Sequence, residues 1–356
     1  MITIGIIVIG RNEGERLATC LRSVQHAALQ EGATSISIAE VVYVDSNSTD
    51  NSIETARGLG AQVVELDPHL PFTAARARNA GAELLLRLHP DINFLQFLDG
   101  DTELHPRWLA HAAGYLDHHK NVAVVCGRRR ERLPEASVYN LLADMEWDTP
   151  IGPAHEFGGD AMIRASVFVR EAGYTPGFIA GEEPEFAARL RIAGYSIVRL
   201  NHEMTLHDLA MTRFKQWWKR TIRSGHAMAQ LAHTHGKAPL YFYRHARRST
   251  LMWAAAIPLT LILLATFFSA WLLLLIPLAY GYLLFRIFRH RIRHGDDRDS
   301  ALVYACYTTI GKFPQLLGFL HFYRNHIARR PSHLIEYKSA PAPPPANPAP
   351  AGVGNT

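Results

Sequence analysis

The chain has 356 residues, 48% of them hydrophobic and 19% charged, so it is neither disordered throughout nor a small disulfide-stapled fold. Its net charge of +5 is unevenly distributed, because residues 244–330 carry twelve basic and three acidic side chains and leave the remainder at −4. The basic charge is therefore confined to one segment and does not predict a nucleic-acid partner. The three cysteines, Cys20, Cys126 and Cys306, lie too far apart for a metal-binding cluster and are typical of a reducing compartment.

The first hundred residues alternate short apolar runs with helical patterns. Strands are predicted at 2–10, 39–46, 61–66 and 93–99. Helices are predicted near 15–30, 50–58 and 73–87. Continuous apolar strands separated by helices predict an α/β fold with a mostly parallel sheet covered on both faces. Ligands bind such sheets at the carboxyl ends of the strands, so the polar residues there are the candidate site residues.

The first two strand ends carry different polar loops. The first is followed by GRNEG at 10–14, which lacks the GxGxxG spacing of a dinucleotide-binding turn and also lacks the glycine-rich phosphate loop of a sugar-nucleotide pyrophosphorylase. The second strand ends at Asp45 and continues as SNSTDNS. Thr49 or Asp50 is expected to cap the next helix, whereas the carboxylate of Asp45 is expected to stay free for a ligand.

The fourth predicted strand is followed by Asp99-Gly100-Asp101. A glycine between two carboxylates permits a tight backbone that lets both reach one cation. An Asp-rich turn without a ligand is the alternative. The position at a strand end, after two other polar strand ends, favours the cation site.

Three carboxylates, Glu182, Glu183 and Glu185, lie together at the predicted start of a helix. Acidic residues often occupy a first helical turn because they interact favourably with the helix dipole, which is the structural alternative. Three carboxylates in four residues exceed that need, and their repulsion is expected to raise one pKa, which suits a general base. His207 and the tryptophan pair at 217–218 are ambiguous, since a lone histidine is usually structural and paired tryptophans usually pack or anchor at a membrane interface.

The C-terminal third has the pattern of a membrane segment. The 37 residues of Ser249–Phe285 include no charged side chain and no histidine. One helix of that length would measure about 55 Å against a hydrocarbon core of about 30 Å, so a two-helix hairpin with a turn near Thr266–Trp271 is predicted. Arginines flank both ends of the run, and a hairpin keeps them all cytoplasmic. Ala301–Phe322, with Lys312 near its middle, is predicted to lie at the membrane interface or, alternatively, to pack on the soluble domain.

Taken in order, these motifs resemble the family 2 glycosyltransferases, inverting enzymes of the GT-A fold, over roughly residues 1–230. The matching elements are Arg11-Asn12-Glu13, Val44–Ser52, Ala77–Gly81, the Asp99 and Asp101 pair, Gly158-Gly159-Asp160 and Gly181–Glu185. The C-terminal segments look like those of membrane-attached bacterial-type members. The resemblance implies a Rossmann-like, mostly parallel central sheet flanked by helices, with C-terminal transmembrane or interfacial helices.

The expected domain organisation follows from this resemblance and from the apolar runs. The boundaries are 1–243 for the catalytic domain, including a linker helix at about 210–243, 244–294 for the membrane hairpin, 295–338 for interfacial or re-entrant helices, and 339–356 for a disordered Pro/Ala-rich tail.

The resemblance also assigns roles to residues at matching positions. A nucleotide-diphospho-sugar, a UDP- or GDP-sugar, would be bound by Asn12, Glu13, Asp45, Arg78, Asp99 and Gly100. Mn²⁺ or Mg²⁺ would be held by Asp101, with His207 as an additional ligand. Gly159, Asp160, Gln216, Trp217 and Arg220 would line the acceptor side.

The general base is assigned with an alternative. The family usually has Glu-Asp where this chain has Glu182-Glu183, so Glu183 takes the place of the base that removes the acceptor proton. The additional methylene of Glu183 moves its carboxylate outward, and Glu182 is therefore the reserve candidate.

The implied function is a metal-dependent transfer of one sugar to a lipid-linked or polysaccharide-precursor acceptor at the cytoplasmic face of the inner membrane. Membrane lipids are a further expected partner. The arginine run at 128–132 is expected either to bind an anionic acceptor or to be a solvated edge. The alternative function is a non-catalytic, membrane-anchored nucleotide-sugar-binding or scaffold protein of a polysaccharide assembly complex.

Overall fold

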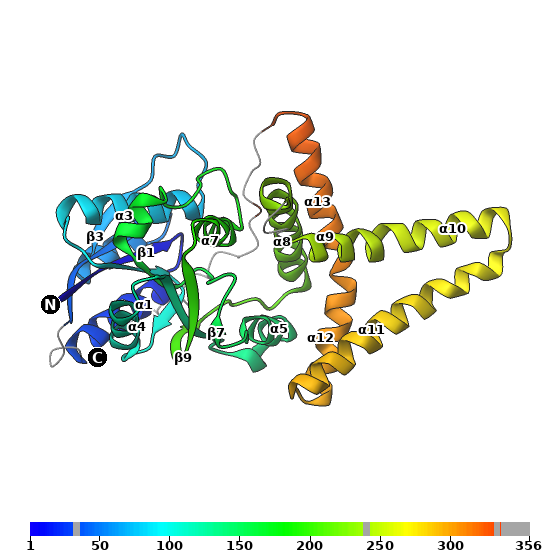
Figure 1. The fold of residues 1–356 in the computed structure, drawn as a ribbon, viewed down its shortest axis with the longest axis horizontal. Helices are drawn as coiled ribbons and strands as arrows, with labels where there is room; N and C mark the ends of the chain where they lie inside the picture. Colours follow the sequence, from blue (N-terminus) through cyan, green and yellow to red (C-terminus); the bar gives the residue numbers. More distant parts are fainter. Residues whose placement is uncertain (31–35, 238–242, 331–334, 336–356) are drawn as a thin grey trace, which may run out of the picture.

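The computed structural model describes residues 1–30, 36–237, 243–330 and 335. Figure 1 shows an α/β body from which a two-helix hairpin projects, with further helices crossing between them. The predicted disordered tail at 339–356 lies outside the described residues.

The N-terminal half follows the predicted alternation of strands and helices. Its elements are β1 (Ile2–Gly10), α1 (Glu15–Gln30), β2 (Ile36–Asp45), α2 (Ser52–Gly58), β3 (Gln62–Glu65), α3 (Ala74–Leu88) and β4 (Phe94–Asp99). Every predicted element up to residue 99 is thus confirmed, with ends that shift by at most three residues.

The remaining elements of the body extend the same sheet. They are β5 (Thr102–Leu104), α4 (Trp108–His118), β6 (Val122–Glu131), a 3₁₀ turn (Pro134–Ala136), α5 (Val138–Trp147), β7 (Gly152–Pro153), β8 (Ala161–Arg164), α6 (Ala165–Arg170), α7 (Glu182–Ile192) and β9 (Ser196–His207). The strand order is β3-β2-β1-β4-β8-β6-β9-β5, with β7 paired to β9. Parallel pairing joins β3, β2, β1 and β4 and also joins β6 to β9, whereas the short strands β8, β5 and β7 pair antiparallel. The sheet is therefore mostly parallel, as predicted, with short antiparallel strands added.

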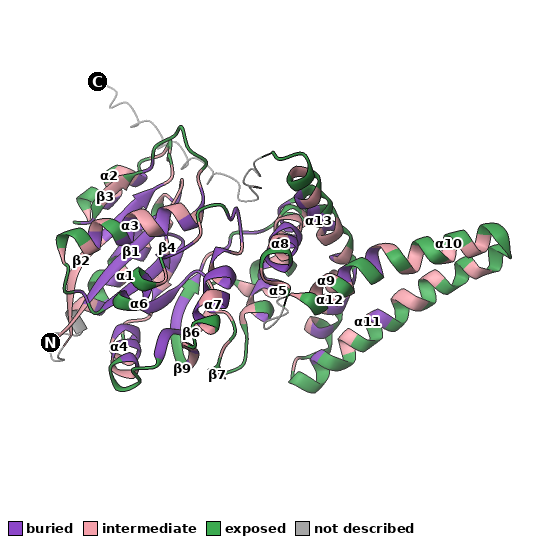
Figure 2. Ribbon diagram, turned by 45° about the horizontal axis from the view of Figure 1, so that its top comes forward, coloured by how far each residue is buried: buried purple, intermediate pink, exposed green. Residues whose placement is uncertain are grey.

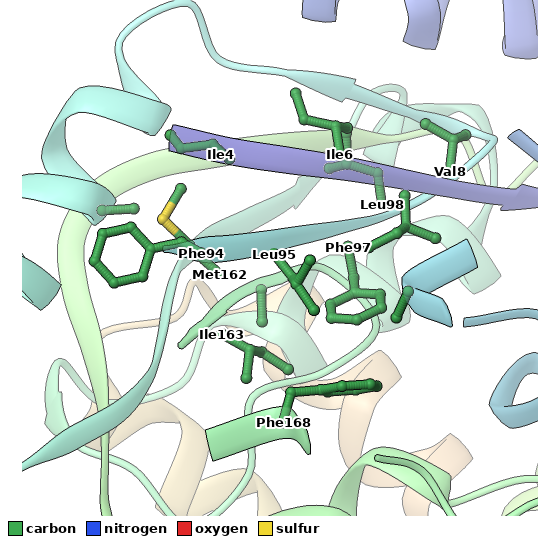
Figure 3. Packing of buried hydrophobic residues seen from close by; sticks show 14 of the residues in the cluster. Ile4, Ile6, Val8, Phe94, Leu95, Phe97, Leu98, Met162, Ile163 and Phe168 are labelled. Atoms are coloured by element: carbon green, nitrogen blue, oxygen red, sulfur yellow. The ribbon is translucent and has the colours of Figure 1, made fainter. Parts of the chain in front are cut away.

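Side chains from both faces of the sheet form the core. Ile4, Ile6 and Val8 of β1 lie beside Phe97 and Leu98 of β4, and all five are buried (Figure 3). Removing such a side chain from water contributes roughly 1.5–3 kcal/mol to folding. Burial of both faces explains why the strands read as continuous apolar runs rather than alternating ones.

Strand register brings the polar strand ends together. Gly10 at the end of β1 is the register partner of Asp45 on β2, and Ile9 is the partner of Asp99 on β4. On the other side, His207 of β9 is the partner of Thr102 on β5. The loops that follow these strands therefore meet at one edge of the sheet.

The predicted hairpin is present as two long apolar helices. They run over Arg244–Phe267 and Ala270–His294, and each is long and apolar enough to cross a membrane. The first comprises α9 (Arg244–Leu251), a π-helical segment (Met252–Ala256) and α10 (Ile257–Phe267), and the second a 3₁₀ segment (Ala270–Leu274) and α11 (Leu275–His294). The chain reverses at residues 268–269, inside the predicted turn, and most side chains of the hairpin are not buried (Figure 2).

The segment expected to be one interfacial piece is two helices. The chain breaks at Gly311 between α12 (Arg298–Ile310) and α13 (Lys312–Ile327), so Lys312 begins a helix instead of lying in the middle of one. One face of α13 packs on α8 (Phe214–His235) so closely that Gly225 contacts the backbone of Gln315. This face of α13 therefore packs as the alternative prediction expected, against a helix of the predicted soluble domain.

The opposite face of α13 is exposed and apolar. Phe313, Leu317 and Leu320 are 40%, 41% and 57% exposed, and Ile327 follows two turns later at 80%. Their spacing of three, four and seven residues places them on one side of the helix. In Figure 1, α12 and α13 run across the base of the hairpin.

Candidate active site

A cavity of about 720 Å³ lies at the carboxyl ends of the strands, between the sheet and α8. It is lined by residues of the first loop (Gly10–Glu13), the Asp99–Asp101 loop, the start of α7 (Ala180–Pro184) and one side of α8 (Arg220–Leu231). Gln315 of α13 and Tyr243, immediately before the hairpin, complete the wall. Segments predicted separately to bind donor, metal and acceptor thus share one cavity.

Asp99, Asp101 and His207 form a cluster that could hold a metal ion. One ligand atom from each lies within 4.8 Å of the others. His207 Nε2 is 3.4 Å from Asp101 Oδ1, and both side chains are buried. Two carboxylates and one imidazole suit Mn²⁺, and the carboxylates suit Mg²⁺, so this donor set fits either ion.

A row of alternating charges runs behind this cluster. The Arg78 guanidinium donates to Glu182 Oε1 at 2.6 Å and to Asp99 Oδ1 at 2.8 Å. Arg129 donates to Asp160 Oδ2 at 2.7 Å and to Asp99 Oδ2 at 3.4 Å. Asp99 is therefore held between two buried or half-buried guanidinium groups, which fix its carboxylate in one orientation.

The network sets the protonation of its members. Burial alone would raise the pKa of Asp99, but the charges of Arg78 and Arg129 hold it below the ordinary value. Asp160 has a pKa above its ordinary value because it is fully buried, although Arg129 opposes the shift. Asp99 is consequently ionised at neutral pH, as a ligand for a metal or for a sugar hydroxyl must be.

The three glutamates of α7 have three different roles. Glu182 pairs with Arg78, and Glu185 accepts from Arg189 and Thr175. Glu183 is half-buried and lines the cavity. Burial and the charge of Glu182 raise the pKa of Glu183 to about 8, which is close to the pH at which a general base works best. These observations favour Glu183 over Glu182 as the base.

The predicted donor-side residues occupy two layers. Asn12, Glu13, Arg78 and Gly100 line the cavity. Asp45 lies behind them at 1% exposure, where its carboxylate accepts from the Tyr43 hydroxyl and from the backbone N–H and hydroxyl of Ser48. The Asp45 carboxylate, which was expected to stay free for a ligand, is thus hydrogen-bonded within its own loop.

The loop after β2 is also tied to the first loop. Asn12 Oδ1 accepts from the Thr49 N–H at 2.7 Å, and Asp50 accepts from the Gly14 and Ser52 N–H groups. Asn51, rather than Thr49 or Asp50, is the residue that precedes the first turn of α2. Thr49 therefore joins two loops, whereas Asp50 both joins the loops and accepts from the first N–H of α2.

Three of the residues predicted to line the acceptor side make contacts within the protein and do not line the cavity. Gln216 Oε1 accepts from the Thr212 and Arg213 N–H groups and so caps the start of α8. Trp217 packs with Leu142 and Met211 in a separate hydrophobic cluster. Asp160 is fully buried in the charge network.

Gly159 and Arg220 do line the cavity. A Cβ on Gly159 would lie 2.5 Å from Asp99 Oδ2 and 2.8 Å from the Arg78 guanidinium, so only glycine allows the Arg78–Asp99 pair to form there. Arg220 is paired with Glu146 at 2.9 Å.

The arginine run is partly a solvated edge, because Arg130 is exposed, and three of its arginines are paired within the chain. Arg129 belongs to the charge network, and Arg130 donates to both oxygens of Asp144. Arg132 pairs with Glu103. These cations are neutralised by carboxylates of the same chain.

Several cavity residues were not found from the sequence. Trp147, Glu156 and Tyr243 line the cavity, and the Tyr243 hydroxyl donates to Glu156, whose pKa is raised by burial. The Arg129 guanidinium lies over the Trp147 ring at 5.3 Å. Tyr243 could have been suspected because it immediately precedes the basic, apolar segment, but the other residues carry no local signal.

The Arg78 network yields a stability prediction. Arg78→Met should lower the free energy of unfolding by about 3–5 kcal/mol, because it leaves the buried Glu182 and the neighbouring Asp99 without their shared cation. Denaturant unfolding of the detergent-solubilised protein measures the change. The double variant Arg78→Met/Glu182→Gln should recover part of the loss. Additive losses would mean that the pair does not carry the effect.

Comparison with known proteins finds a family model that matches the N-terminal part of the chain. Residues 5–157 match the family model for Glycosyl transferase family 2. Among curated proteins, no sequence matches.

Several solved structures are similar to this chain at low sequence identity. A mannosyltransferase from Pyrobaculum calidifontis, in complex with GDP-mannose and Mn²⁺, is 16% identical with a TM-score of 0.56, over 90% of this chain and 86% of that one. Glucosyl-3-phosphoglycerate synthase from Mycobacterium tuberculosis, in complex with Mn²⁺, UDP and glucosyl-3-phosphoglycerate, is 20% identical with a TM-score of 0.46, over 66% and 80%. S. aureus TarS residues 1–349 are 15% identical with a TM-score of 0.47, over 92% of each chain. Residues 5–157 thus match the family 2 glycosyltransferase model, and the chain as a whole has the GT-A fold of the mannosyltransferase.

Proposed function

We propose that this enzyme transfers one sugar, with inversion, from a UDP- or GDP-sugar to a lipid-linked or polysaccharide-precursor acceptor at the cytoplasmic face of the membrane. One observation carries the proposal: the Asp99, Asp101 and His207 cluster and the Glu183 carboxylate line the same cavity. An inverting transfer needs these two groups on opposite sides of the anomeric carbon, one for the leaving diphosphate and one for the incoming hydroxyl.

On the donor side, Asp101 and His207 would hold Mn²⁺ or Mg²⁺, with Asp99 within reach of the same ion. When bound, the ion supplies charge that neutralises the diphosphate as it leaves. Asn12, Glu13 and Gly100 line the cavity where the nucleoside would lie. Asp45 would act there through the loop that it holds, since its own carboxylate is occupied by Tyr43 and Ser48.

On the acceptor side, Glu183 would take the proton of the attacking hydroxyl as the acceptor oxygen bonds to the anomeric carbon and the bond to the diphosphate breaks. Glu182 cannot take this proton without giving up its pair with Arg78. Arg220, Arg223, Met228 and Leu231 of α8 also line the cavity. A basic and apolar wall suits an acceptor that carries a phosphate and a lipid chain.

The position of the cavity supports a membrane-bound acceptor. Gln315 lines the cavity from α13, and the opposite face of that helix carries exposed Phe313, Leu317 and Leu320. Exposed Arg324, Arg329 and Arg330 follow on the same segment. An apolar stripe with basic neighbours at the base of an apolar hairpin is the pattern of a helix that lies on anionic lipid.

The direct test is donor turnover. Detergent-purified protein with Mn²⁺ and a panel of nucleotide sugars should release nucleoside diphosphate from one donor, and Asp101→Asn and Glu183→Gln should each slow the release by about 10²–10⁴-fold. The exposed Glu54→Gln on α2 is the matched control and should leave the rate unchanged. No release from any donor, with or without lipid acceptors, would instead favour the non-catalytic scaffold.

The raised pKa of Glu183 predicts a pH profile. The base must be deprotonated, so kcat/KM should rise about tenfold per pH unit below a pKa of about 8 and level off above it. Initial rates of diphosphate release between about pH 6 and pH 9.5 measure this profile. In Glu183→Gln the rising limb should disappear. A wild-type profile that falls toward alkaline pH would exclude Glu183 as the base.

If the hairpin crosses the membrane, its tip lies on the opposite side from its two ends. Cysteine labelling can test this topology. In a Cys306→Ser background, Ser269→Cys at the tip should react with a membrane-impermeant maleimide in intact bacterial cells, whereas Asp299→Cys should react only after permeabilisation. Both positions are exposed, and the remaining native Cys20 and Cys126 are buried. Labelling of Ser269→Cys only after permeabilisation would show that the hairpin does not cross the membrane.

A further inference from the structure

We infer that Glu131 is a positioning residue for the metal site, which holds the imidazole of His207 so that Nε2 is the nitrogen presented to the cation. The inference rests on the proposed metal-dependent function and adds a residue that no sequence motif marks. Glu131 does not line the cavity among the described residues, so it would act through His207 and not on substrate.

Strand pairing brings the two residues together. Glu131 ends β6, His207 ends β9, and the two are register partners in the parallel pair. Glu131 Oε2 lies 3.9 Å from His207 Nδ1, while His207 Nε2 lies 3.4 Å from Asp101 Oδ1. The imidazole is therefore placed between a carboxylate on each side, one behind it and one in the metal cluster.

This arrangement selects a tautomer. A neutral imidazole has one N–H, and only the other nitrogen has a lone pair for a metal. The negative charge of Glu131 beside Nδ1 favours the proton there, which leaves the lone pair on Nε2. At 3.9 Å the contact is an electrostatic one and not a hydrogen bond. Histidines that bind metals usually have a carboxylate or carbonyl group at the second nitrogen, and Glu131 lies in that place.

The Glu131 side chain is itself rigidly held. It is fully buried, and Oε2 accepts from the Leu209 N–H at 3.2 Å, while Oε1 accepts from Asn140 Nδ2 at 3.2 Å. Asn140 is fixed in turn by the Met211 N–H and the Leu133 carbonyl. A carboxylate fixed in this way can hold the neighbouring ring in one orientation.

A third contact restricts the tilt of the ring. Trp147 packs against His207 with ring centroids 4.8 Å apart, and the Arg129 guanidinium lies on Trp147. His207 thus has an aromatic neighbour at one side and charged neighbours at both nitrogens. The ligand is preorganised before any cation arrives.

A purely structural role is the competing explanation, because Glu131 also joins β6 to the loop at Leu209. Burial of a carboxylate is costly, and the contacts of Glu131 with the Leu209 N–H and Asn140 offset that cost. A structural role predicts a loss of stability and no change in metal affinity. The positioning role predicts a loss of metal affinity that depends on His207.

The experiment measures Mn²⁺ affinity of the full chain by electron paramagnetic resonance, with UDP or GDP present and no sugar donor. Glu131→Gln should bind Mn²⁺ about 10–100-fold more weakly than wild type. Glu135→Gln, an exposed glutamate four residues away, is the matched control and should bind as wild type does. Thermal unfolding in EDTA reports separately on folding.

A double-mutant cycle decides between the explanations. In a His207→Ala background, Glu131→Gln should cause no further loss of Mn²⁺ affinity, because its effect is transmitted by the ring. Equal Mn²⁺ affinity of Glu131→Gln and wild type, with binding abolished in Asp101→Asn, would overturn the positioning role and leave the proposed function standing. No Mn²⁺ binding by wild type would overturn both. If Glu131→Gln does not fold, Glu131→Asp, which keeps the charge and withdraws it from the ring, replaces it in the cycle.

Discussion

The buried guanidinium of Arg78 is the contact on which the site depends. It comes from α3 and joins Asp99 at the end of β4 to Glu182 at the start of α7, two residues more than eighty positions apart in the chain. Both Glu182 and Glu183 line the cavity, but Arg78 engages Glu182 and leaves Glu183 with a raised pKa. The Arg78 guanidinium therefore orients the Asp99 carboxylate and also makes the surroundings of Glu182 and Glu183 different. The two contacts together are a stronger constraint than either contact alone.

The body of the fold could be predicted from the sequence because short stretches of residues determine its strands and helices. Continuous apolar strands, helical periodicity and an uncharged run of 37 residues identified the N-terminal elements and the hairpin. The antiparallel strands β5, β7 and β8 are two to four residues long and too short to show a period. The break at Gly311 was missed because apolar residues continue on both sides of it.

The site was predictable where a residue lies directly at a strand end or helix start, as Asp101 and Glu183 do. It was not predictable where a distant partner decides the role. The Asp45 carboxylate accepts hydrogen bonds from Ser48 and Tyr43, and the Gln216 side chain accepts one from the backbone at the start of its own helix. Such competition between a ligand and nearby backbone or hydroxyl donors depends on three-dimensional geometry that no spacing rule contains.

Helix α13 packs on α8 with one face and exposes apolar side chains on the other. This arrangement limits how far the chain can be truncated. A chain cut at residue 243 would keep Asp99, Asp101 and His207, but it would lose Gln315 from the cavity wall. It would also expose the surface of α8 that Phe319 and Phe322 cover, around Ala229. The catalytic part is thus not a detachable globular module. One wall of its cavity includes Gln315 of α13, whose opposite face is exposed and apolar, so the C-terminal helices are a structural component of the cavity.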